Sequence, residues 1–313
     1  MRKTIFLFAL ATAVAFTACN GGNQEKDTNS SEQKAGTVTI EHSLGKTEVP
    51  VNPERVIVLD FSALENLDAI GVKPVGIPKT GLPKYFAKYK DDESVVDLGT
   101  LVEANIEKVN ELQPQLIIIG GRLRESYDQL SKIAPTIITE WDTADQFGAL
   151  QKNLDNLGLI FDKKEDFDAA FNALKTKADA VKEKSSKSDA KALVVLHNKG
   201  RFSAYGSGSR FGLIHDILGV QEAAKGLDTH LHGTKTSSEF IAETNPDILF
   251  VVDRSAAIGD TPLNKEEIEN KLIQRTNAFK NGKIIYLNSE TWYLSGSGLN
   301  SLNMMIDEVD NVL

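Results

Sequence analysis

One residue pattern occurs twice, once in each half of the chain, and it constrains the fold more than any other feature. Residues 114–122 read PQLIIIGGR and residues 246–254 read PDILFVVDR, each a proline, a short apolar run and an arginine eight positions after the proline. Earlier in each half stands another apolar run, RVIVLD at 55–60 and ALVVLH at 192–197. Short runs rich in β-branched residues are typical of buried strands. The repetition therefore predicts two units of similar design.

Helical patterns separate these predicted strands. In the first half they are ALENLDAIGV at 63–72 and NIEKVNELQP at 105–114. In the second half they are RFGLIHDILGV at 210–220, where we expect a helix from about Phe211, and SEFIAETNP at 238–246. Strands that alternate with helices predict βαβ units and mainly parallel sheets. We therefore predict an α/β fold with two similar lobes.

A single long helix is expected to join the two lobes. Nothing between residues 162 and 186 breaks a helix, and Phe167, Phe171 and Leu174 fall on one face with charged residues opposite. Such a helix would be about 35 Å long at 1.5 Å per residue. One packed helix, in place of two or three loose connections, predicts limited closure of the lobes. The predicted parts are an N-terminal lobe at 37–160, a linking helix at 161–187 and a C-terminal lobe at 188–313.

The first nineteen residues form a separate segment. Two basic residues precede an apolar stretch at 5–16, which is too short to span a bilayer as a helix. This arrangement, at 1–19, is typical of a secretory signal peptide. Its end, FTAC, resembles a bacterial lipobox and makes Cys19 a lipidation site, although a plain signal with an incidental cysteine is the alternative. Residues 20–36 hold no large apolar side chain and predict a flexible tether.

Charge restricts the partners. The chain has 313 residues, a formal net charge of −9 and an isoelectric point near 5.2. So acidic a protein repels a phosphate backbone, and we exclude nucleic acid as a partner. Any anion that it binds must be held by a local cluster of cations. Cys19 is the only cysteine, so once its thiol carries lipid neither a disulfide nor a thiolate metal site can form.

Three arginines can supply that cluster. Arg122 and Arg254 end the two repeated strands, and open α/β sheets bind ligands beyond the carboxyl ends of their strands. Matched lobes would then place one arginine on each wall of a shared cleft. Arg210 lies in YGSGSRFG at 205–212, whose glycines let backbone N–H groups approach an anion at a helix N-terminus. The alternatives are structural salt bridges for the strand-end arginines and an ordinary tight loop.

Three longer stretches carry a family resemblance: GSGSRFGLIHDILGV, SSEFIAETNPDILFVVDR and KIIYLNSETWYL. With them, nearly all of residues 37–313 resembles the substrate-binding lipoproteins of ABC transporters for iron-siderophores and cobalamin. The similarity is greatest to those for catecholate siderophores of the petrobactin and enterobactin type. It implies class III architecture, in which one long helix joins the lobes, with Arg122, Arg210 and Arg254 lining the ligand pocket.

The resemblance also implies a biological role. The protein would capture a ferric catecholate siderophore between its lobes and deliver it to a dimeric ABC permease for iron uptake. It would not be an enzyme, it would have no intrinsic cofactor, and it would act as a monomer. Its lipid anchor would hold it on the extracytoplasmic side of the cell membrane, in a periplasm or on the outer face of a Gram-positive cell.

Further residues receive roles from the same resemblance. In relatives that accept tetradentate bis-catecholates, a histidine and a tyrosine at the positions of His232 and Tyr293 complete the coordination of Fe³⁺, which suits phenolate and imidazole ligands. His230 is an alternative ligand two residues away. From the residues alone, the two also fit a loop histidine and an aromatic at the core rim. Trp292 and Tyr205 are candidate stacking surfaces for ligand rings.

Glu107 and Glu239 occupy matching places, each seven residues before a repeated proline. The family implies that one glutamate in each lobe meets arginines of the permease. A structural role is the alternative, because the helix dipole stabilises negative charge near the start of a helix.

Two other functions share some of these features. A haem- or cobalamin-binding protein would have the same fold and a different pocket. Three cleft arginines favour a multiply charged anion over neutral cobalamin, and haem propionates would need only one or two. A hydrolase is more remote, since the chain has neither a G-x-S-x-G elbow nor an H-E-x-x-H zinc motif.

Overall fold

The computed structural model of the protein describes residues 36–259 and 261–313. The predicted signal peptide at 1–19, its Cys19 and nearly all of the predicted tether at 20–36 lie outside the described residues. Within the two described ranges, no helix has both the length and the apolar character that crossing a bilayer requires.

The first sheet is built on two short, wholly apolar strands. β3 (Val56–Leu59) and β6 (Leu116–Ile119) pair in parallel, and every residue of both is buried. Strands that are apolar on both faces need cover on both faces, which helices provide here. β4 (Gly76–Ile77), β5 (Val96–Asp97) and β7 (Thr136–Ile138) complete a parallel sheet of order β5-β4-β3-β6-β7. We call this sheet and the elements around it the N-terminal lobe.

Short capped helices follow these strands. Asp60 starts the first of them, because its side chain accepts the N–H of Ala63 at 2.9 Å. The elements around the sheet are the hairpin β1 (Thr37–His42) and β2 (Gly45–Pro50), and the helices α1 (Phe61–Ala69), η1 (Lys84–Phe86), α2 (Ala87–Lys90), α3 (Ile106–Glu111), η2 (Gly121–Ser126), α4 (Tyr127–Leu130) and α5 (Gln146–Phe161).

The second sheet is centred on β8 (Lys191–Asn198) and β12 (Ile248–Asp253), which are parallel. β13 (Ile284–Tyr286) extends the sheet in parallel beside β12, whereas β9 (Arg201–Tyr205) and β11 (Thr234–Thr236) run antiparallel. The order is β11-β9-β8-β12-β13. We call this sheet the C-terminal lobe, together with β10 (Gln221–Glu222), η3 (Leu213–Ile217), α7 (Ser238–Thr244), α8 (Arg254–Ala257), α9 (Lys265–Ile268), η4 (Ile273–Arg275), α10 (Asn277–Lys280) and α11 (Ser289–Leu294).

The prediction of an α/β fold with parallel sheets is confirmed, but the second half departs from the repeat after β8. Lys199 and Gly200 adopt left-handed φ angles of 50° and 73°, so the chain turns back as β9 instead of entering a helix. The prediction of a regular helix from Phe211 was wrong. Only a short π-helix forms there, because the chain turns at Gly219, with φ 70°, to lay β10 beside β8.

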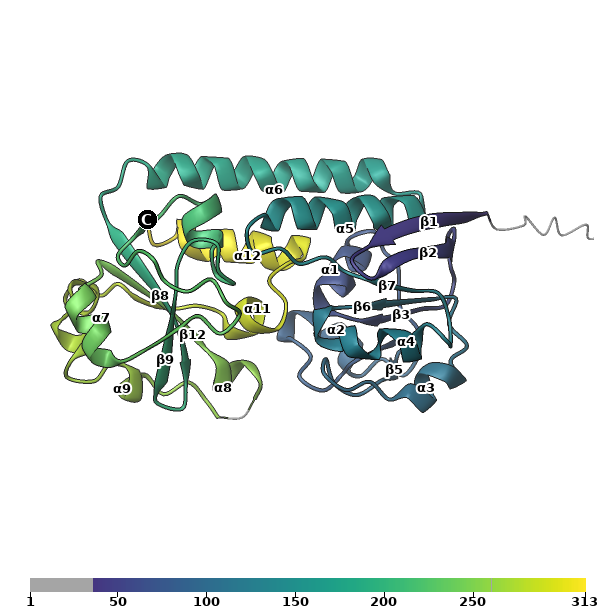
Figure 1. Ribbon diagram of the computed structural model, residues 1–313, viewed down its shortest axis with the longest axis horizontal. Coiled ribbons are helices and arrows are strands. Elements are labelled where there is room, and N and C mark those ends of the chain that lie inside the picture. The colour runs from purple at the N-terminus through teal and green to yellow at the C-terminus, as the bar shows by residue number, and fades with distance from the viewer. Residues whose placement is uncertain (1–35, 260) are drawn as a thin grey trace, which may run out of the picture. The chain divides into compact units, whose positions relative to one another are not determined.

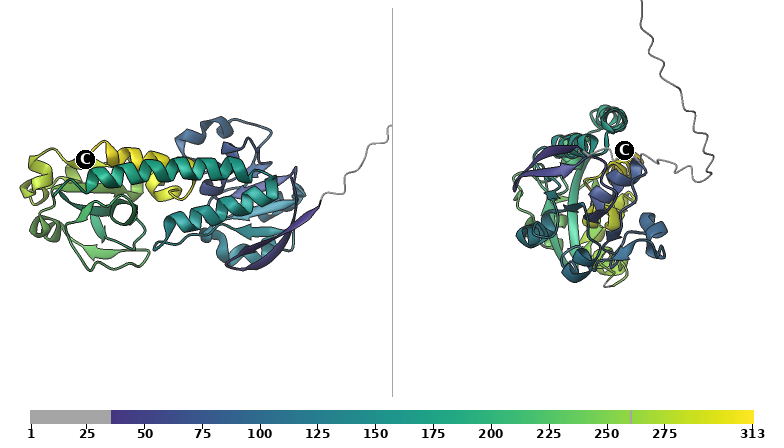
Figure 2. Two further views of the ribbon diagram at one scale, coloured as in Figure 1. Left: turned by 90° about the horizontal axis from the view of Figure 1, so that it is seen from above. Right: turned by 90° about the vertical axis from the view of Figure 1, so that its right-hand side faces the viewer.

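Helix α6 (Lys164–Ser185) runs alongside both lobes (Figures 1 and 2). Its 22 residues give a length of about 33 Å. The helix packs on α5 and on the last helix of the chain, α12 (Leu299–Asp310). An apolar stripe explains this packing, and its buried residues are Phe167, Phe171, Leu174, Ala178 and Val181.

Helix α12 forms a second connection between the lobes, which the sequence did not predict. It packs against α1 of the N-terminal lobe as well as against α6 and α11. Lys177 of α6 meets Asp307 of α12 at 2.6 Å, and Lys184 meets Asp310 at 2.9 Å. The two lobes are therefore joined by packed helices rather than by loose strands.

Candidate ligand-binding site

Arg122 lies just beyond the carboxyl end of β6, in η2, with an exposed side chain. Gly120 in the turn that presents it leaves room for the carboxylate of Asp60, which a Cβ at this position would displace. Asp60 stands at the end of the neighbouring strand β3 and caps α1. Burial raises the pKa of Asp60, whereas its hydrogen bond from Ala63 and the nearby charge of Arg122 lower it. An acid therefore lies within electrostatic reach of this arginine.

Arg254 occupies the matching place in the C-terminal lobe. It is the first residue of α8, directly after β12, and is half-buried. The helix begins there because Asp253 accepts the N–H of Ala256 at 2.8 Å. Arg122 and Arg254 thus each lie at the carboxyl edge of a parallel sheet, where open α/β sheets bind ligands.

Arg210 comes from the glycine-bearing loop between β9 and η3. The N–H of Ser207 donates to Glu222 at 2.8 Å, and the N–H of Gly208 donates to Asp216 at 2.7 Å. Carboxylates of the lobe therefore already accept the N–H groups of Ser207 and Gly208, so these two are not free for a ligand anion. The loop contributes the Arg210 side chain instead.

The three arginines converge on one residue of α11, Tyr293. Arg122 and Arg210 both donate to its carbonyl oxygen, at 2.7 and 2.6 Å. Arg254 donates through Nε to its hydroxyl at 2.9 Å. The guanidinium carbons of Arg122, Arg210 and Arg254 lie 5.6, 4.4 and 5.8 Å from the centre of its ring, within the range of cation–π attraction. One tyrosine therefore brings together cations from both lobes.

The local helix geometry makes this shared carbonyl available. α11 ends at Leu294, so the carbonyl of Tyr293 belongs to the last turn, whose oxygens have no partner within the helix. This contact could not be read from the sequence, since it depends on where α11 stops. Tyr293 was predicted as a site residue for its phenol, and its backbone oxygen was missed.

The arginine cluster is strongly positive. Among the described residues, none of the three arginines forms an ion pair with a carboxylate. Burial, and then the neighbouring charge of Arg122, lowers the pKa of Arg210. Cations that burial and mutual repulsion both disfavour are stabilised by an anion between them. The arrangement is therefore suited to an anionic ligand, and the planar guanidinium groups suit oxygen acceptors and aromatic rings.

His232 lies in the exposed segment between β10 and β11. The preceding residue, Leu231, receives a hydrogen bond from the hydroxyl of Tyr205 at 3.4 Å, and Gly233 lies so close to that ring that a Cβ would contact it. This histidine has no hydrogen bond or ion pair within the described ranges. The alternative candidate His230 is also exposed and lies 3.7 Å from Asp228. The imidazole of His232 is thus open to a ligand.

The two predicted stacking residues are corrected by the structure. Trp292 is 2% exposed and donates its indole N–H to Glu308 at 2.6 Å. Tyr205 is 1% exposed and meets Phe211 edge-to-face, with the ring centres 4.7 Å apart. Aromatic rings this deep in the core offer no face to a ligand. Both rings contact Phe211, the residue after Arg210, and so support the backbone that carries this arginine.

Glu107 and Glu239 stand in the first turns of α3 and α7, and both are exposed. The residue just before each helix caps it through its side chain: Asn105 caps α3 and Ser237 caps α7. The Ser237 hydroxyl lowers the pKa of Glu239. The two carboxylates therefore hold equivalent, solvent-facing places in the two lobes.

A separate hollow lies away from the arginines. About 680 Å³ lies between α1, α6 and α12, lined by Glu65, Tyr85 and Lys177 among others. We place the site at the arginines because cations from both lobes converge there, whereas in the hollow Glu65 accepts from Tyr85 and Lys177 donates to Asn303. Over residues 36–259 and 261–313, no group of three His, Cys, Asp or Glu side chains could hold a metal ion by itself.

Two similar α/β lobes joined by a long helix, with a cationic cluster at their carboxyl edges, define the architecture of a solute-binding protein. Comparison with known families agrees: the periplasmic binding protein model matches residues 56–291. The chain belongs to this family.

Individual relatives narrow the comparison. The petrobactin-binding protein YclQ of Bacillus subtilis (strain 168) is 45% identical over 319 residues, covering 100% of this chain and 99% of that protein. Its crystal structure superposes with a TM-score of 0.86, over 88% of this chain and 98% of that one. The catecholate-siderophore binding protein VctP of Vibrio cholerae has a TM-score of 0.83 at 34% identity, over 88% and 100%. The ferric-anguibactin-binding protein FatB of Vibrio anguillarum (strain ATCC 68554 / 775) is 36% identical over 87% of this chain and 86% of that protein.

Proposed function

We propose that this protein captures a ferric catecholate siderophore between its lobes and delivers it to an ABC permease for iron uptake. One observation carries the proposal: Arg122, Arg210 and Arg254 converge on Tyr293 from both lobes, and among the described residues none of them forms an ion pair with a carboxylate. A ferric tris-catecholate has three negative charges, which three arginines match in number. Guanidinium groups can also donate to catecholate oxygens and stack on catechol rings.

The same cluster gives Tyr293 a role. With a hexadentate ligand, iron has no free position and Tyr293 acts by holding the arginines. With a tetradentate bis-catecholate, two positions remain, and we assign them to the phenol of Tyr293 and the imidazole of His232. Phenolate oxygen and imidazole nitrogen both suit ferric iron. When the hydrogen bond between Arg254 and the Tyr293 hydroxyl breaks, the phenol would be free for iron and the guanidinium would be free for the catecholate.

The remaining parts of the proposal concern the chain outside the site. Residues 1–19 would be a signal peptide, Cys19 a lipid anchor and 20–36 a tether to the membrane. The lobes would be 37–160 and 188–313, with the linking helix at 161–187. The protein would act as a non-catalytic monomer that docks on a dimeric permease through Glu107 and Glu239. A pair of equivalent carboxylates suits a two-subunit partner, since the same contact is made twice.

Fluorescence quenching by a panel of ligands tests this function. Trp141 is 41% exposed and Trp292 directly precedes Tyr293, so the two tryptophans report on different regions of the fold. Ferric bis- and tris-catecholates should quench the emission saturably, while cobalamin and haem should not. The gallium complexes, which keep the charge and lack the iron absorption, control for light absorbed by the ligand. Saturable binding of haem or cobalamin with none of a catecholate would refute the proposal.

A further inference from the structure

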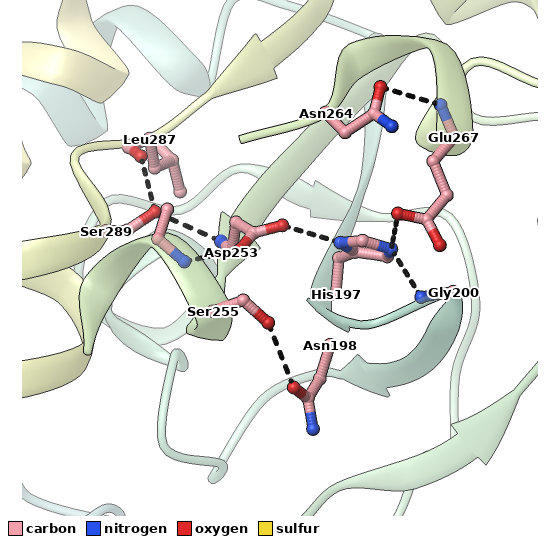
Figure 3. Close-up of polar contacts among 10 residues, drawn as sticks. His197, Asn198, Gly200, Asp253, Ser255, Asn264, Glu267, Leu287 and Ser289 are labelled. Atoms are coloured by element: carbon pink, nitrogen blue, oxygen red, sulfur yellow. Dashed lines mark hydrogen bonds and ion pairs between the residues drawn. The ribbon is translucent and has the colours of Figure 1, made fainter. Parts of the chain in front are cut away.

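A buried polar pair lies directly behind Arg254. His197 is the last residue but one of the neighbouring strand β8 and stands opposite Asp253, the residue before Arg254 (Figure 3). Nδ1 of His197 lies 2.6 Å from Oδ2 of Asp253, and both side chains are 3% exposed. We propose that His197 and Asp253 are positioning residues, which fix the backbone at Arg254 so that its guanidinium points into the ligand site. This inference rests on the proposed function.

The hydrogen bonds define how His197 is held. Its Nε2 accepts the N–H of Gly200 at 3.0 Å. Since Nε2 accepts, Nδ1 carries the proton of the neutral ring and donates it to Asp253. Glu267 Oε2 lies 3.9 Å from Nε2 at the lobe surface. The imidazole is thus oriented from one side by the β8–β9 turn and presents its donor to the carboxylate on the other.

Asp253 also bonds to the two helices that meet at the arginine cluster, α8 and α11. Its Oδ1 caps α8, the helix that starts with Arg254. Its backbone N–H donates to the hydroxyl of Ser289 at 3.1 Å, and Ser289 is the first residue of α11, which carries Tyr293. Asp253 therefore fixes the start of α8, which carries Arg254, through its carboxylate. It fixes the start of α11, which carries Tyr293, through its backbone N–H.

The residue on the other side of Arg254 is held by the same strand. The hydroxyl of Ser255 donates to Asn198 at 3.2 Å (Figure 3). The last two residues of β8, His197 and Asn198, thus hold the two residues that flank Arg254. Such bracketing limits rotation of the peptide that bears the guanidinium.

Packing alone does not explain a polar pair in this position. A buried carboxylate is costly unless hydrogen bonds satisfy it, and an apolar pair of similar volume would join the strands as well. Directional hydrogen bonds add orientation, which a binding site needs and a sheet interior does not. Supporting partners of this kind commonly change ligand affinity when they are removed.

The same two strands offer a matched control. At their amino ends, Asp247 accepts the N–H of Lys191 at 3.0 Å and the side-chain N–H of Asn277 at 3.0 Å. This link also joins β8 to the start of β12, but it lies at the edge of the sheet opposite the arginines. Asp247→Ala should therefore lower stability without changing ligand affinity.

The test combines a ligand-free signal with affinity. In the ¹⁵N-labelled free protein, His197→Phe should shift the Arg254 Nε–H resonance, assigned by its loss in Arg254→Lys. His197→Phe should also weaken ferric catecholate binding about 10-fold, by analogy with the lower end of the range for lost supporting contacts of metal ligands. His197→Asn keeps a donor at the position of Nδ1 and should restore both signals. In an Arg254→Ala background, His197→Phe should cause no further loss of affinity.

Three results would overturn the inference: an unchanged Arg254 resonance in His197→Phe, an equal loss of affinity in Asp247→Ala, or a full further loss in the Arg254→Ala background. The proposed function fails separately. If the wild-type protein binds no ferric catecholate but its Arg254 resonance still responds to His197→Phe and not to Asp247→Ala, the positioning role stands and the ligand is different.

Discussion

The buried carboxyl group of Glu65, at the junction of the lobes, makes the stability of the protein depend on pH. Replacement of Glu65 by glutamine should remove this dependence. Glu65 lies on α1 and is 3% exposed. It accepts the hydroxyl hydrogen of Tyr85 at 2.6 Å and the N–H of Ser301, at the start of α12, at 2.7 Å. Tyr85 in turn lies 2.6 Å from the hydroxyl of Ser295. This cluster joins the N-terminal lobe to the chain after α11.

Burial raises the pKa of Glu65 from 4.5 to about 7, and hydrogen bonds from Tyr85, Ser301 and Ser295 oppose the rise. The folded state therefore holds the proton more tightly than the unfolded state. The corresponding stability is fully present below pH 4.5, falls as the pH rises and is lost once the pH passes about 7. At about 1.4 kcal/mol for each tenfold change in proton affinity, the whole effect is about 3 kcal/mol.

Glutamine is neutral at every pH, so Glu65→Gln should not follow this curve. We expect the free energy of unfolding of the variant, relative to wild type, to rise by about 3 kcal/mol between pH 4 and pH 8. Urea denaturation at half-unit steps of pH measures it, and the difference cancels the groups that both proteins share. Glu111→Gln, at an exposed position of α3, is the control and should follow wild type. A constant difference between Glu65→Gln and wild type over this range would refute the reasoning.

Three further predictions concern the anchor, the permease and the iron. Cys19→Ala should move the protein from the membrane to the soluble fraction with an unchanged melting temperature; retention in the membrane would contradict lipidation. Glu107→Arg combined with Glu239→Arg should leave siderophore affinity intact and abolish siderophore-dependent growth under iron limitation, and normal growth at equal expression would contradict docking. Tyr293→Phe and His232→Ala should each shift the charge-transfer band of a bound ferric bis-catecholate. Each should also weaken binding of the bis-catecholate far more than binding of a tris-catecholate. Unaltered spectra in both variants would exclude direct coordination.

The strand ends could be predicted from the sequence because their signals are local. Each repeated run is apolar on both faces, so it must be a buried strand, and an arginine directly after it must lie at the carboxyl edge of the sheet. Arg122 and Arg254 lie there in the structure. The amphipathic pattern of α6 is of the same kind, since one helix face alone decides it.

The parts that the sequence could not predict depend on contacts between distant segments. RFGLIHDILGV has helical spacing, but the pairing of β10 with β8 forces the chain to turn at Gly219. Trp292 is predicted to stack on a ligand ring, but α12 brings Glu308 to its indole N–H and the ring is buried. The shared carbonyl of Tyr293 depends on where α11 ends; Gly296, with φ 82°, marks that end, but the arginines that meet the carbonyl come from distant segments.

The affinity of the arginine variants for a ferric catecholate tests the central claim most directly. Isothermal titration should show that Arg122→Ala, Arg210→Ala and Arg254→Ala each lose about 1–3 kcal/mol of binding free energy, the value of a charge-assisted contact, with nearly unchanged melting temperatures. Arg124→Ala is the control, because Arg124 shares η2 with Arg122 but donates to Ser43 at 2.9 Å. Wild-type affinity in all three variants, together with a large loss of thermal stability, would show that the arginines hold the lobes together and do not bind the ligand.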